Sequence, residues 1–109
     1  MSKFDDFFQA VLDGAKSIGG QAASDFLKQA TTDSAQFKLQ AEMDLKKWTT
    51  ELANDEIDKE DFESLLRGQL AEATLAALLK AGIAGQKAAQ LRDKVIDLAI
   101  GSAFKILVV

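Results

Sequence analysis

Residues 95–109 read VIDLAIGSAFKILVV, and eleven of these fifteen residues are apolar. Asp97, Gly101 and Lys105 recur four residues apart, so they form one polar line along an otherwise apolar helix. A helix with so much apolar surface is typical of elements that are buried on several sides. We expect the cover to be the protein's own core, a second copy of the chain, another protein or lipid.

The N-terminal part of the chain also predicts a helix, because its apolar residues recur at steps of three and four. Over residues 3–30 they fall inside an arc of roughly 100°, the width of a core-facing stripe. The stripe consists of Phe4, Phe7, Phe8, Val11, Ala15, Ile18, Ala22 and Phe26. Ser2 and Asp5 resemble a capping box at its start. Gly19 and Gly20 interrupt the helix propensity, so we expect a kink or hinge between them.

A second stripe continues over residues 33–53, with a spacing that keeps one face of a straight helix in register. It consists of Phe37, Ala41, Leu45, Trp48 and Leu52. Asp33 with Gln36 predicts the cap of a new helix, so that residues 3–53 would form two helices, 3–30 and 33–53. The phase of the stripe does not require that break, so the alternative fold is an extended helical hairpin with residues 3–53 as one long helix. Three further apolar residues lie opposite the stripe: Ala35, Leu39 and Met43.

The third predicted helix covers residues 59–81 and has a clear beginning. Asp58 is expected to cap its N-terminus, with Asp61 at the third helical position. Ile57 and Phe62 are spaced as a hydrophobic staple around that cap.

Gly82 followed by the apolar Ile83 matches the Schellman pattern for the end of this helix. The last helix then covers residues 84–108. Short connections between amphipathic helices favour an antiparallel bundle. The sequence therefore predicts an all-α single domain over residues 1–109, built from four helical segments at residues 3–30, 33–53, 59–81 and 84–108.

The composition excludes many kinds of chemistry. The chain has no cysteine and no histidine, the residues that dominate zinc, copper and haem sites and the commonest activated nucleophiles. We therefore predict no enzymatic activity, no cofactor and no small-molecule substrate. A net charge of −4 argues against a nucleic-acid partner. The acidic N-terminal residues do not resemble a secretory signal, so we expect a cytoplasmic protein.

The acidic residues at 54–61 resemble the exit half of an EF-hand calcium loop, with Ile57 at the apolar position. Thr50, Leu52 and Asp55 do not fit the rest of that loop, because two ligand positions and the invariant glycine fail. We expect these acids to favour a helix N-terminus instead and predict no metal site.

Several predicted helices carry more apolar surface than one stripe requires. The excess is hard for a single chain of 109 residues to bury, so it favours an interaction face. The residues expected to form that face are Leu75, Leu79, Ile96, Ile100, Phe104 and Leu107.

The first functional hypothesis is a self-associating structural or scaffold protein, a homo-oligomer that uses this face of the C-terminal helix. A second is a peripheral protein whose amphipathic helix binds lipid or another apolar surface. A third is a helical subunit or regulator that binds an unrelated protein. The apolar C-terminal segment, residues 95–109, is too short and too charged to span a membrane, since Asp97 and Lys105 lie inside it.

Overall fold

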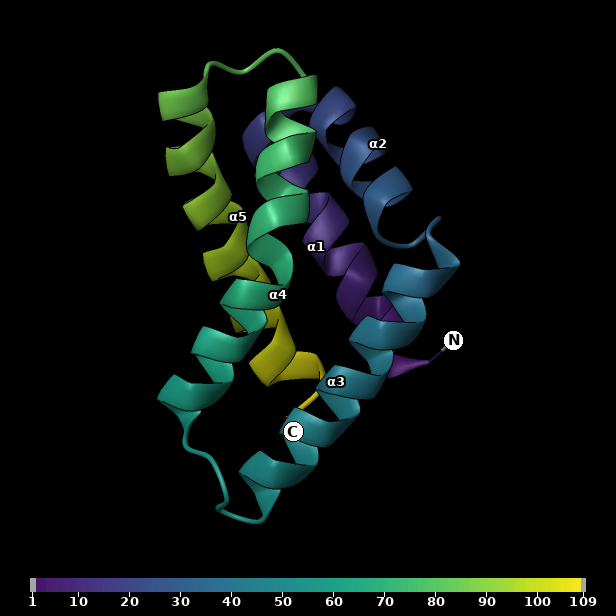
Figure 1. Ribbon diagram of the computed structural model, residues 1–109, viewed down its shortest axis with the longest axis vertical. Helices are drawn as coiled ribbons and strands as arrows, with labels where there is room; N and C mark the ends of the chain where they lie inside the picture. Colours follow the sequence, from purple (N-terminus) through teal and green to yellow (C-terminus); the bar gives the residue numbers. More distant parts are fainter. Residues whose placement is uncertain (1, 109) are drawn as a thin grey trace.

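Five helices make up the computed structural model, which describes residues 2–108 and contains no strand over that range (Figure 1). They are α1 (Lys3–Gly19), α2 (Gln21–Ala30), α3 (Ala35–Ala53), α4 (Lys59–Lys80) and α5 (Gly85–Ile106). The all-α prediction is confirmed. The prediction of four segments was wrong by one, because residues 3–30 form two helices.

The first break lies at Gly20, the single residue between α1 and α2. Its φ of 92° and ψ of 173° belong to a region that is essentially restricted to glycine, so the helix cannot continue through it. The two helices fold back on each other and are tied together by Ser24, whose buried hydroxyl donates to the Leu12 carbonyl at 3.1 Å. The expected kink is therefore a full corner.

The second break, between α2 and α3, shows that the alternative fold with one helix over residues 3–53 was wrong. The Asp33 amide donates to the Lys28 carbonyl at 2.9 Å, which closes the end of α2. Ser34 then caps α3, and its hydroxyl accepts from the Phe37 amide at 3.3 Å. The cap was predicted one residue earlier, at Asp33. Ser34 takes that role because its extended backbone brings the hydroxyl to the first turn.

Both predicted caps of α4 are confirmed. At the start, Asp58 accepts from the Asp61 amide at 2.8 Å, and Asp61 accepts from the Asp58 amide at 3.1 Å. At the end, the Gly82 amide donates to the Leu79 carbonyl at 3.0 Å and the Ile83 amide to the Leu78 carbonyl at 3.2 Å. This is the Schellman pattern, with Gly82 at a φ of 92°.

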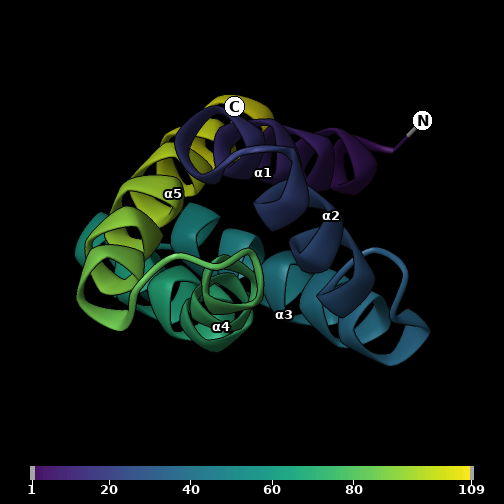
Figure 2. The same ribbon diagram turned by 90° about the horizontal axis from the view of Figure 1, so that it is seen from above.

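The helices form two layers with the core between them (Figure 2). α1 and α5 lie side by side in one layer, and α4 lies beside α3 in the other. α2 packs against both α1 and α4 and joins the layers at one edge. The largest fully buried side chains of the core are Phe7, Phe62, Leu27, Leu45, Leu66, Leu70, Leu78, Ile96, Val95 and Thr74.

The turn between α3 and α4 contains Asp55, the only residue other than glycine with a positive φ (59°) among residues 2–108. The Asp55 amide donates to the Leu52 carbonyl at 3.2 Å, and the Glu56 amide donates to the Glu51 carbonyl at 2.8 Å. This is the same end motif as at Gly82, but it has a side chain where glycine is favoured.

Asp55→Gly is therefore expected to raise the free energy of unfolding by about 0.5–1 kcal/mol, because glycine adopts the left-handed conformation without strain. Urea denaturation measures the change. Asn54→Gly is the matched control, since Asn54 has an ordinary φ of −92° and glycine there should lower stability. Asp55→Asn removes the charge but keeps a side chain, so its free energy of unfolding separates the effect of charge from the effect of backbone freedom. Equal losses for both glycine variants would contradict the left-handed turn.

Candidate functional site

The C-terminal helix does not expose the face that the sequence predicts. Ile96, Ile100 and Leu107 are buried, with exposed fractions of 0%, 7% and 4%. α5 packs against α1 on one side and α4 on the other, so the protein covers both of its apolar faces (Figures 1 and 2). The sequence predicted that these three residues contribute to an interaction face, whereas in the structure two helices of the same chain cover them.

The other three predicted face residues have different surroundings. Phe104 is half-buried, and its ring lies 5.4 Å from the ring of Phe62, tilted by 60°. Leu75 is half-buried against a small cluster at the α4–α5 corner, formed by Ala23, Leu78 and Ala88. Leu79 alone remains exposed, at 46%. The six residues therefore do not form one continuous surface.

The two most exposed large apolar side chains lie on α3 instead. Leu39 is 62% exposed and Met43 is 58% exposed. They are four residues apart, about 6 Å along the helix, so they lie on one face. We call this surface the α3 outer face, formed by Ala35, Leu39 and Met43, all of which are exposed. The sequence pattern predicted that these residues lie opposite the main stripe of the helix, but they were not among the residues predicted to form the interaction face.

The packing of α3 explains why this face is free. Of its nineteen residues only Ala41 and Leu45 are buried, and both belong to the main core. α3 packs mainly against α4, at the edge of its layer (Figure 2). Gln69 of α4 donates to Asp44 of α3 at 3.2 Å and fixes one side of that contact. The face turned away from α4 and the core has no cover among the described residues.

Other exposed apolar side chains are isolated. Leu65 (38%) and Leu79 (46%) share α4 but lie fourteen residues apart, about 21 Å along the helix. Leu98 of α5 (49%) covers Gly14 of α1, where a Cβ would lie 3.4 Å from its Cδ1 atom. Single exposed leucines are normal on protein surfaces. The adjacent pair on α3 is the larger apolar feature.

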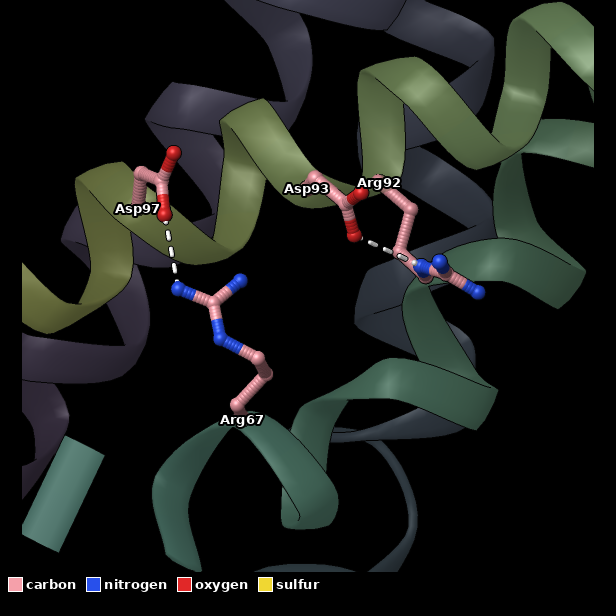
Figure 3. Close-up of polar contacts among 4 residues, drawn as sticks. All are labelled: Arg67, Arg92, Asp93 and Asp97. Atoms are coloured by element: carbon pink, nitrogen blue, oxygen red, sulfur yellow. Dashed lines mark hydrogen bonds and ion pairs between the residues drawn. The ribbon is translucent and has the colours of Figure 1, made fainter. Parts of the chain in front are cut away.

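Of two ion pairs at the surface near α5, one joins it to α4 and the other lies within α5 itself. Arg67 of α4 donates to Asp97 of α5 at 2.8 Å, and Arg92 donates to its neighbour Asp93 at 3.1 Å (Figure 3). All four side chains are at least partly exposed, so the pairs add little to stability. Asp97 belongs to the predicted polar line of the C-terminal helix, and its exposure confirms the position of that line.

A third ion pair joins the first turns of α1 and α3, where Lys38 lies 3.0 Å from Asp5. The hydrogen bond that Lys38 donates lowers the pKa of Asp5 below its ordinary value of 3.8. The same contact raises the pKa of Lys38 above 10.5. Both shifts move titration away from neutral pH. This pair is therefore a structural tie and is not poised as an acid or base.

A hollow of about 550 Å³ lies between the α3–α4 turn and the end of α5. Its lining includes the carboxylates of Asp55, Glu56, Asp58 and Asp61. Within residues 2–108, no three His, Cys, Asp or Glu side chains are grouped so that they could hold a metal ion. The capping box already uses Asp58 and Asp61, so these acids serve the start of α4.

None of the five helices has a stretch both long and apolar enough to cross a membrane, as judged over the described residues. Comparison with known protein families, curated proteins and solved structures finds no match to this chain.

Proposed function

We propose that this chain is a non-enzymatic, self-associating helical protein with a structural or scaffolding role, and that the α3 outer face is its contact surface. The observation that carries the proposal is the exposure of Leu39 and Met43, 62% and 58%, on one face of one helix. Burying such a pair against a partner contributes about 25 cal/mol for each Å² of apolar surface removed from water, a gain that must exceed the entropy lost on association.

The contact surface differs from the one that the sequence predicts. Ile96 and Ile100 cannot contact a partner while they are buried under α1 and α4. A methionine next to a leucine suits a contact surface, because its flexible thioether adapts to the shape of the partner. All three hypotheses drawn from the sequence relied on the C-terminal face, so the burial of Ile96 and Ile100 removes the original support of each. We keep self-association as the proposal for the α3 outer face, and lipid binding and binding of an unrelated protein are the competing outcomes of its test.

The variant Leu39→Asp/Met43→Asp is expected to stay folded and to be monomeric under conditions where the wild type is at least dimeric. Light scattering over a range of protein concentrations measures the mass, and circular dichroism at 222 nm measures the helix content. Both substitutions introduce charge at exposed positions, so the fold should lose less than about 1 kcal/mol.

Leu79→Asp is the matched control, because Leu79 is also an exposed leucine and belongs to the face predicted from the sequence. It should leave the mass of the oligomer unchanged. If Leu79→Asp dissociates the oligomer and the α3 variant does not, the contact surface lies on α4. A wild-type monomer at every concentration would refute self-association. Flotation of that monomer with anionic vesicles would then favour the lipid hypothesis.

A further inference from the structure

The two ends of the α3 outer face carry opposite charges. Asp33 lies just before the first turn of α3, and Lys46 and Lys47 lie beyond Met43 toward its C-terminal end. All three side chains are exposed. Within residues 2–108, none of them takes part in an ion pair. The surface is therefore a short apolar stripe with an acid at one end and two bases at the other, and the half-buried Glu42 lies on its flank beside Lys38.

The helix rise decides which partner geometry matches these charges. Each residue advances an α-helix by about 1.5 Å. If a second α3 packs antiparallel across a two-fold axis near Ala41, Leu39 of each copy lies beside Met43 of the other. Ala35, at the start of α3, then lies opposite Lys47 of the second copy, and Asp33, two residues before Ala35 in the preceding turn, lies at the same end of the interface as Lys46 and Lys47 of that copy.

A parallel pair of helices would have the opposite result. Asp33 would face Asp33, and each pair of lysines would face the same pair on the other copy. Like charges in contact destabilise an interface and select against that arrangement. Only the antiparallel arrangement brings acid to base at both ends, and the two-fold axis makes the two ends equivalent.

We infer that the partner of the α3 outer face is a second copy of this chain, bound in an antiparallel two-fold dimer in which Asp33 of each copy pairs with Lys46 and Lys47 of the other. This inference rests on the proposed self-association and adds the identity, direction and register of the contact. Because the charged groups lie at the exposed rim, the dimer weakens as the salt concentration rises.

Charge reversal tests the register with two variants of the full chain, Asp33→Lys and Lys46→Glu/Lys47→Glu. Alone, each variant places like charges at both ends of the dimer, so its dissociation constant should rise by about tenfold or more. An equimolar mixture of the two variants restores opposite charges at both ends. Native mass spectrometry and light scattering should therefore detect a heterodimer close to wild-type affinity.

Lys87→Glu/Lys94→Glu is the matched control, because it makes the same change in net charge at exposed lysines of α5. It should leave dimer affinity within about twofold, since exposed charges far from an interface are largely screened. Circular dichroism should be unchanged for every variant, because none of these side chains is in the core.

The outcomes separate this inference from the proposed function. If Leu39→Asp/Met43→Asp dissociates the wild-type dimer but neither charge reversal weakens it, the antiparallel register is wrong and self-association stands. The register is also wrong if both reversals weaken the dimer but the mixture forms no heterodimer. If the wild type is monomeric at every concentration, both proposals fail.

Discussion

Ile96→Asp is expected to abolish the folded state at neutral pH. Ile96 has an exposed fraction of 0% and belongs to the main core, so the new carboxylate would have no access to water. A buried charge without a partner destabilises a protein by several kcal/mol, and the lost apolar contacts add further destabilisation. Since the free energy of unfolding of a small domain is about 5–15 kcal/mol, this one substitution removes most or all of the stability.

Circular dichroism at 222 nm and urea denaturation measure the effect. Leu79→Asp makes an equivalent chemical change at a side chain that is 46% exposed and lies outside the α3 outer face, and it should alter the free energy of unfolding by less than about 0.5 kcal/mol. If Ile96→Asp instead remained helical and only dissociated an oligomer, Ile96 would be an interface residue. The face predicted from the sequence would then be correct, and the packing of α5 between α1 and α4 would be wrong.

The parts of the fold that depend only on residues close together in the sequence were predictable. Helical periodicity identified every helical region, and the two ends of α4 were found from Asp58, Asp61 and Gly82. Each of these caps is a set of hydrogen bonds between residues only a few positions apart. Such contacts form wherever the local sequence allows them, so they need no knowledge of the rest of the molecule.

The corner at Gly20 was only partly predictable. The paired glycines indicated a kink, but the apolar stripe continued past them through Ala22 and Phe26. In the structure the buried positions shift by one residue after the corner. Ala23 and Leu27 are fully buried, whereas Ala22 is exposed and Phe26 is half-buried. A turn at glycine resets the helical phase, and spacing within the sequence does not show by how much.

The location of the exposed surface could not be predicted, because it depends on which helices pack together. Leu39 lies opposite the main stripe of its helix, and Ile100 belongs to the surplus apolar surface predicted for the C-terminal helix. Ile100 is covered because α5 lies between two neighbours, and Leu39 is exposed because α3 lies at the edge of a layer. Periodicity identifies a surplus apolar face, but only the tertiary arrangement decides whether that face meets the core or water.

A close approach between helices predicts a second large effect, at Gly19. A Cβ added there would lie 2.5 Å from the Leu78 Cδ2 atom of α4 and 2.9 Å from the Ala23 Cβ atom of α2. Leu78 is only 1% exposed and Ala23 is fully buried, so neither can move aside without disturbing the corner. Gly19→Ala is therefore expected to lower the free energy of unfolding by about 1–3 kcal/mol, as measured by urea denaturation.

The sign of this effect is what makes the test decisive. In an open helix, glycine to alanine stabilises by up to about 1 kcal/mol. Gly68→Ala should do so, because apart from the adjacent residues and the backbone of its own helix no atom lies within 4 Å of the new Cβ. The loss at Gly19 should shrink in a Leu78→Val background, since valine lacks the Cδ2 atom that approaches most closely. A gain at Gly19 equal to that at Gly68 would mean that α1 and α4 do not meet at this corner. The layer arrangement that buries α5 and leaves the α3 outer face uncovered would then lose its support.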